Sequence, residues 1–249
     1  MNTNIYSFII TTLAGLSTLF GLIPCFLKNK NQDKVIIASL SFSAGVMLII
    51  SLFSLIPESL NLFTYKFKLF PSTIILSIFI VLGIIFSMTI DQKIEKIVSN
   101  NSLYKLGLIS VIALMLHNIP EGITTFISST VDTKLGFILA LSITLHNIPE
   151  GISIAIPIYY STKNIKKAFI YTLISGFSEL LGAILAFLFL SKYINNLTLG
   201  IILSLTAGIM IHISIYELIP NALLYKNNKV TIIFFLLGSL TMLLCSLLF

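Results

Sequence analysis

Long apolar stretches separated by short polar segments form the main pattern of this chain. A helix needs about 20 apolar residues to cross about 30 Å of hydrocarbon, because it rises about 1.5 Å per residue. Eight stretches meet this requirement, and they cover residues 5–27, 35–63, 72–90, 106–129, 135–159, 168–190, 197–223 and 230–249. The loops between them are short. We therefore predict an all-α integral membrane protein with eight transmembrane helices, in which residues 1–249 form a single transmembrane domain.

Composition supports a membrane location and charge supplies an orientation. The chain is 57% hydrophobic and 10% charged, whereas soluble domains contain about 25% charged residues. Every basic residue is a lysine in a loop or at a helix end, with eleven in the odd-numbered loops and four in the even-numbered loops. The positive-inside rule then places the odd-numbered loops in the cytoplasm and both termini on the outer side of the cell membrane, the plasma membrane. Because the lysines form no single stripe, they do not indicate nucleic-acid binding.

One polar motif occurs twice in the middle of apolar stretches. Residues 117–122 and residues 146–151 both read HNIPEG. An ionisable side chain at bilayer depth costs several kcal/mol by the lower estimates, so it usually marks a pathway or a binding site. Two identical polar clusters therefore indicate a functional site near the middle of the membrane.

Other segments of the chain also occur in two related copies. Residues 43–60 (SAGVMLIISLFSLIPESL) resemble residues 206–223 (TAGIMIHISIYELIPNAL), and residues 14–21 resemble residues 175–182 more weakly. The copies lie on helices that cross the membrane in opposite directions, as expected of an inverted repeat. We predict a 3+2+3 bundle: repeat one at about 5–90, a central helix pair at about 106–159, and repeat two at about 168–249. Such repeats are typical of secondary transporters.

Helical geometry suggests how each motif could bind metal. At about 100° per residue, the Glu of each motif projects between the His and the Asn, so its carboxylate could share one metal with each. The Pro removes a backbone donor and loosens the helix, and the Gly allows a close neighbour. Glu179 is expected at the same depth on the sixth helix. The predicted metal ligands are His117, Asn118, Glu121, His146, Asn147, Glu150 and Glu179.

The ligand types narrow the choice of metal. Imidazole, carboxylate and amide ligands suit Zn²⁺ and other first-row divalent ions better than Ca²⁺ or Mg²⁺. Zinc is the first choice, and iron, manganese, cobalt and cadmium remain open. Affinity should fall at low pH, because protons compete for the same ligands.

Four further residues are candidates for the permeation pathway, and each also has a simpler structural explanation. They are Met47, Glu58, His212 and Glu217. The Met is ordinarily a packing residue, and the His could be a hydrogen-bonded core residue. Both Glu residues lie near Pro and a helix end, where solvation alone would explain them.

The two HNIPEG motifs, the segment SGFSELLG and the repeated AGxM…LIP segments resemble the ZIP (Zrt/Irt-like) family of divalent metal transporters. HNIPEG in both central helices is most similar to the bacterial ZupT-like branch. The resemblance implies a binuclear centre formed by the seven ligands above, metal import toward the cytoplasm, and a homodimer. Many family members have a His-rich loop between the third and fourth helices, but residues 91–105 contain no His, which puts metal sensing through this loop in doubt.

The leading function is therefore metal import by alternating access, with the metal ion as substrate and no bound cofactor. A selective metal channel would use the same ligands and stays open as an alternative. An intramembrane metalloenzyme is a third interpretation. It fits less well, because zincins place Glu directly after His in HExxH, whereas Asn occupies that position here. We expect no enzymatic activity.

Overall fold

The computed structural model describes residues 3–26, 31–97, 102–190 and 195–248, and within these ranges the chain forms helices and no strand. Eight helical spans are long and apolar enough to cross a membrane. Four of them are single helices, namely α5 (Leu69–Ile97), α6 (Ser102–Val131), α7 (Thr133–Thr162) and α11 (Asn228–Leu248). These spans confirm the predicted all-α fold class.

The other four spans are built from consecutive helical segments. The first joins α1 (Thr3–Leu16) to α2 (Ile23–Phe26) through a 3-10 helix, and the second joins α3 (Gln32–Ile50) to α4 (Ile56–Thr64) through a π-helical turn. The sixth is α8 (Ile165–Leu185) with a π-helical turn after it. The seventh joins α9 (Asn196–His212) to α10 (Ile219–Leu223) through a further π-helical turn.

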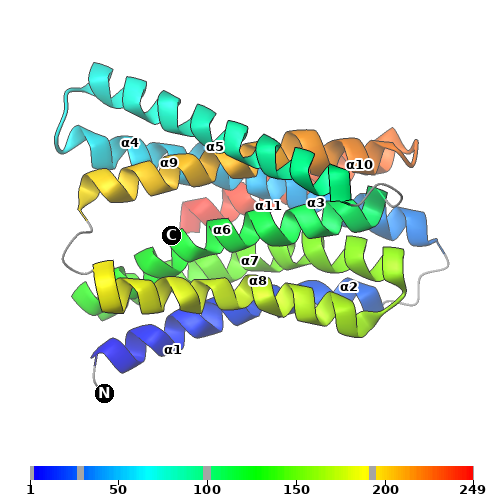
Figure 1. Cartoon of the computed structure of the whole chain (residues 1–249), viewed down its shortest axis with the longest axis horizontal. Coiled ribbons are helices and arrows are strands. Elements are labelled where there is room, and N and C mark those ends of the chain that lie inside the picture. Colours follow the sequence, from blue (N-terminus) through cyan, green and yellow to red (C-terminus); the bar gives the residue numbers. More distant parts are fainter. Residues whose placement is uncertain (1–2, 27–30, 98–101, 191–194, 249) are drawn as a thin grey trace.

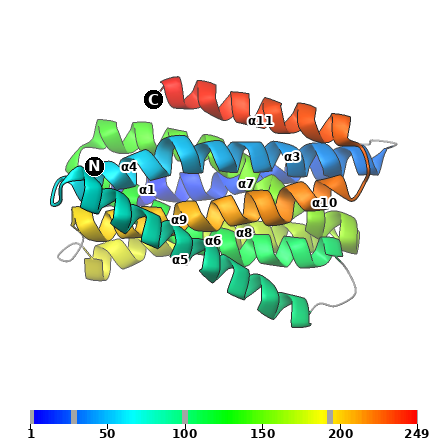
Figure 2. The ribbon, with the colours of Figure 1, turned by 90° about the horizontal axis from the view of Figure 1, so that it is seen from above.

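The helices lie side by side along the long axis of the molecule (Figure 1). In the most apolar stretch of the second and fourth spans, 72% of the residues are buried inside the protein. In the third and eighth spans only 17% of the corresponding residues are buried. The third and eighth spans are α5 and α11, which lie at opposite edges of the bundle in Figure 2. In a membrane their exposed apolar surfaces would face lipid. The helix α6 packs along both α7 and α8.

A proline follows the π-helical turn in each of two spans. Pro57 follows the turn Ser51–Leu55, and Pro220 follows the turn Ile213–Leu218. Proline would clash with the carbonyl four residues earlier in a regular α-helix. The wider turn avoids that clash, and the amide of the residue before each proline instead donates to the carbonyl five residues back. The chain therefore passes each proline without leaving the helix.

Two glycines bring neighbouring segments unusually close to the central helices. A Cβ atom at Gly122 would lie 2.0 Å from the carbonyl oxygen of Glu179, and one at Gly151 would lie 1.9 Å from that of Thr18. Both glycines end the HNIPEG motifs. The contacts agree with the expectation that these positions admit a close neighbour, and they set the distance of α8 from α6 and of the 3-10 helix from α7.

A methyl group at either position should force these segments apart. Overpacking of this kind costs about 1–3 kcal/mol, which for a chain of this size corresponds to a Tm lower by about 2–12 °C. We therefore expect Gly122→Ala to lower the melting temperature of the detergent-purified protein. Gly107→Ala is the matched control, because its added Cβ meets mainly the flexible end of the Ile158 side chain. Equal losses in the two variants would contradict this packing role.

Candidate metal centre

A carboxylate held between two imidazoles forms the core of the site. Glu121 Oε1 lies 3.2 Å from His117 Nε2 on the same helix, α6, and 2.9 Å from His146 Nε2 on α7. The ligand atoms of these three residues lie within 4.8 Å of one another, close enough to share one metal ion. The sequence places Glu121 between His117 and Asn118 of its own helix, but in the fold its second partner is the imidazole of the facing helix.

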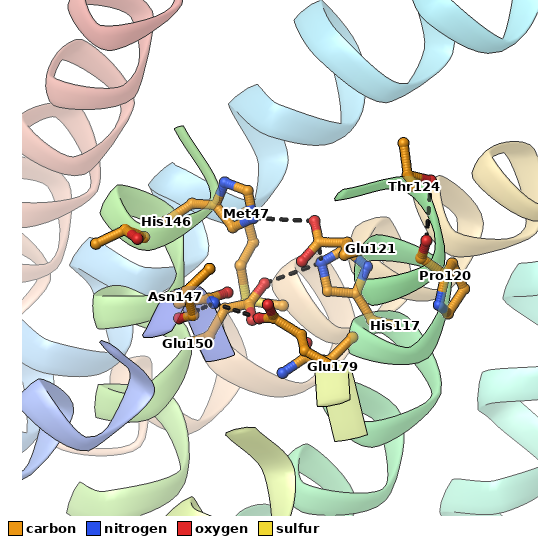
Figure 3. A network of polar contacts seen from close by, with 12 residues as sticks. Met47, His117, Pro120, Glu121, Thr124, His146, Asn147, Glu150 and Glu179 are labelled. Carbon is orange, nitrogen blue, oxygen red and sulfur yellow. Dashed lines mark hydrogen bonds and ion pairs between the residues drawn. The ribbon is translucent and has the colours of Figure 1, made fainter. Parts of the chain in front are cut away.

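Glu150 connects the two motifs a second time. Its Oε1 atom lies 3.0 Å from His117 Nε2, so each motif places its Glu beside the His of the other motif. Figure 3 shows these side chains converging from α6 and α7. The antiparallel pairing of the two helices therefore builds one shared cluster from two copies of the same motif.

The two amides are oriented by backbone carbonyl groups. Asn118 Nδ2 donates to the carbonyl oxygen of Ser175 at 3.2 Å, and Asn147 Nδ2 donates to that of Ala14 at 2.9 Å. Because only the amide nitrogen can donate, these bonds fix which atom of each side chain is the oxygen. Both Oδ1 atoms have no hydrogen-bond partner in the described part of the chain. Each is thus available as an oxygen ligand.

Glu179 joins the cluster from α8, as its predicted depth requires. Asn147 Nδ2 also donates to Glu179 Oε1. Five oxygens at the cluster have neither a hydrogen-bond donor nor an ion-pair partner among the described residues, namely Asn118 Oδ1, Glu121 Oε2, Asn147 Oδ1, Glu150 Oε2 and Glu179 Oε2. Buried polar atoms normally have partners, so a concentration of unpaired oxygens at one place fits a site that receives a cation.

Burial makes the charge balance of this cluster unusual. Its three carboxylates are at most 4% exposed and its two histidines at most 5% exposed. None of the lysines whose side chains the structure describes is buried. A buried charge is costly unless it is paired, and a divalent cation would supply the missing positive charge. The geometry therefore suits cation binding.

The four pathway candidates lie in different surroundings. Met47 is fully buried on α3 and its side chain reaches toward the cluster (Figure 3). Glu58 is exposed on α4 and lines a cavity that also reaches Glu121 and His146. The fold thus brings Met47 near the metal cluster and places Glu58 in a cavity that leads to it.

The remaining two candidates lie on the seventh span. His212 is buried, with Nδ1 2.9 Å from Ser87 Oγ and its ring stacked on Tyr216. These contacts match the simpler interpretation of a core histidine. Glu217 is buried in the π-helical turn, and its backbone carbonyl accepts a hydrogen bond from Asn221 Nδ2 at 2.8 Å.

Sequence reasoning missed the residues that hold the ligands in place. The carbonyls of Ala14 and Ser175 orient the amides, and Ser43 Oγ donates to the carbonyl of Pro149 at 2.6 Å, inside the second motif. Backbone carbonyls carry no residue-type signal. The alignment of residues 14–21 with 175–182 was the only available hint, since Ala14 and Ser175 occupy the first position of each segment.

Eight apolar spans around a buried cluster of carboxylates and imidazoles define a class of protein, the multi-pass membrane proteins with a polar centre between their helices. The family model described as ZIP zinc transporter matches residues 101–246. The chain is 34% identical to the zinc transporter ZupT of Clostridium perfringens, over 100% of this chain and 98% of the relative. It is 37% identical to the ZupT proteins of Streptococcus mutans and Chlorobaculum parvum, over 98% of this chain and 97% and 98% of those relatives.

The chain belongs to the ZIP zinc transporter family. This membership confirms the resemblance drawn from the two motifs, and it identifies a transport protein rather than an enzyme.

A bound cation should stabilise the fold, because it neutralises the buried carboxylates. A ligand at 100 times its Kd adds about 2.7 kcal/mol to the free energy of unfolding, or about 5–10 °C in Tm for a chain of this size. We expect Zn²⁺ to raise the Tm of the purified protein by this amount, and to have little effect on Glu121→Ala. His212→Ala is the matched control, since His212 lies outside the cluster and should keep the shift. An equal shift in Glu121→Ala would place the binding elsewhere.

Proposed function

We propose that the protein imports divalent metal ions, zinc first, across the cell membrane into the cytoplasm. Relatives that match nearly the whole chain are named zinc transporters, and the described spans suit a membrane. Iron, manganese, cobalt and cadmium are further candidate substrates, because imidazole, amide and carboxylate ligands also accept these ions.

One observation carries this proposal: Glu121 lies between the Nε2 atoms of His117 and His146 at a buried contact of two membrane-spanning helices. Three adjacent side chains of these types are the ligands that Zn²⁺ commonly takes. No thiolate is present in the cluster, so the affinity can stay moderate enough for release. All seven proposed ligands come from one chain, and the site needs no second subunit even if the transporter is a homodimer.

The centre is proposed to hold two metal ions. The first would be bound by the two histidines and Glu121. The second would lie among the unpaired oxygens of Asn118, Asn147 and Glu179. Glu121 and Glu150 each retain a free Oε2 atom, so they can bridge the two positions. The hydrogen bonds from the amide nitrogens to carbonyl groups support this arrangement, because they keep the amide oxygens available.

We further propose that the two three-helix repeats move relative to the central pair and expose the site to each side in turn. Support for the inverted repeat comes from paired contacts. The π-helical turns occur at matching places of residues 43–60 and 206–223, and the two amide anchors, Ala14 and Ser175, occupy matching places of the weaker repeat. Repeats of this kind commonly alternate around a fixed midplane site.

The lysine distribution supports the proposed orientation, with the odd-numbered loops in the cytoplasm and both termini outside the cell.

Transport should fail when a central ligand is removed. In proteoliposomes, we expect His117→Ala and Glu150→Ala to reduce Zn²⁺ uptake by at least about tenfold, a loss seen even for residues that only support a metal ligand. Wild-type uptake should also weaken as the pH falls from about 7 to about 5.5, since protons displace metal from His and carboxylate ligands. His212→Ala serves as the control. Wild-type rates in both ligand variants would refute the site assignment.

Flux measurements should separate the carrier from the channel. A carrier that exposes its site alternately turns over slowly and saturates with substrate. We therefore expect uptake that saturates with Zn²⁺ concentration and no measurable single-channel current in planar bilayers. Ohmic currents through the purified protein would exclude alternating access and support a metal channel.

A further inference from the structure

A cavity of about 150 Å³ joins the metal centre to one end of the bundle. At its inner end it is lined by Glu121 and His146, which are the two members of the cluster that keep a small exposure, 4% and 5%. His117, Glu150 and Glu179 on the other side of the cluster are fully buried. The cavity therefore opens onto one edge of the centre.

The second span sets the length and direction of this cavity. Ile50, Ser54 and Glu58 line it in turn, from the residue before the π-helical turn to the first turn of α4. The span rises at most about 12 Å from Ile50 to Glu58, because a regular α-helix rises about 1.5 Å per residue. Leu139 lies two turns from His146 on α7 and lines the same cavity toward the same end. By the proposed orientation this is the external end.

Most of the cavity wall is apolar. The apolar side chains belong to Ile50, Leu55, Leu139, Ile143, Leu203 and Met242. Glu58 is the ionisable residue of the lining that is not part of the metal cluster, and it is exposed whereas Glu121 is buried. Ser54 and Thr124 add two polar residues to the lining. The space can hold several water molecules, and thus a partly hydrated ion.

We propose that Glu58 is the first ligand that an incoming divalent cation meets, and that it delivers the ion along this cavity to Glu121 and His146. The proposal rests on the import function above. A carboxylate at the mouth of a low-dielectric cleft concentrates cations and raises their rate of association by tenfold or more. Glu58 lies outside the cluster, so it should act on capture and not on the central affinity.

Comparison with the second repeat supports a difference in charge between the external and the cytoplasmic end of the bundle. In the alignment of residues 43–60 with 206–223, Glu58 corresponds to Asn221, which is neutral. The nearest carboxylate of that repeat is Glu217, one turn closer to the centre and buried. An exposed carboxylate at this distance from the centre is therefore a feature of the first repeat, at the end where import would begin.

Uptake kinetics test this role. In proteoliposomes that expose the external face, we expect Glu58→Gln to raise the KM for Zn²⁺ by about tenfold and to change the maximal rate less than twofold. Glu58→Asp, which keeps the charge, should stay within about threefold of the wild-type KM. The Zn²⁺-induced rise in Tm should be preserved in both variants. Higher ionic strength should raise the wild-type KM more than that of Glu58→Gln, because salt screens the carboxylate.

Asp132→Asn provides the matched control, since Asp132 is an exposed acid on the loop between α6 and α7, at the same end of the bundle. Its KM should equal that of the wild type. A Glu58→Gln variant with wild-type KM would overturn the proposal while leaving the import function intact. Loss of both the maximal rate and the Tm shift in Glu58→Gln would also overturn it, because Glu58 would then belong to the fold or the centre. Absence of uptake by the wild type would instead refute the proposed function.

Discussion

The contact of Glu121 with two imidazoles from antiparallel helices is the interaction on which the rest of the structure depends. Polar groups at this depth must satisfy one another, because the surrounding lipid offers no hydrogen bonds. The helices α6 and α7 therefore have to face each other with their motifs in register. Gly122 and Gly151 then allow α8 to pack closely on the first motif and the first span on the second.

The close packing around the centre also explains how the amides can serve as ligands. An Asn side chain is free to flip unless its nitrogen is held. Here a carbonyl from α1 holds Asn147 and one from α8 holds Asn118. The helices that flank the central pair are thus part of the site, although Glu179 is the single proposed ligand among them.

Transport requires a centre that binds a cation and also releases it. The absence of cysteine from the cluster is consistent with moderate affinity, since thiolates bind Zn²⁺ tightly. The absence of lysine favours binding, since an ammonium group would neutralise the carboxylates without metal. The π-helical turns before Pro57 and Pro220 lie on the spans that flank the centre. Such turns occur often at functional sites, and their weaker hydrogen bonding gives these spans a natural place to bend.

The sequence alone determined the eight spans, the two polar motifs and the types of ligand. Apolar length fixes a membrane helix, and the spacing within HNIPEG fixes which side chains share a helix face, so these features follow from local geometry. The grouping of the motifs with Glu179 also agrees with the prediction made from depth. The role of these residues as metal ligands stays a prediction.

Only the tertiary structure decided which atoms meet. Angular spacing places Glu121 beside its own His and Asn, but the rotation and distance of the neighbouring helix give it His146 as the second partner. Those quantities depend on glycine contacts between segments far apart in the chain. The same holds for Glu58, whose place near a proline suggested only solvation, whereas the packing of several spans puts it in a cavity that leads to the centre. Long-range packing sets such relations, and local periodicity does not encode them.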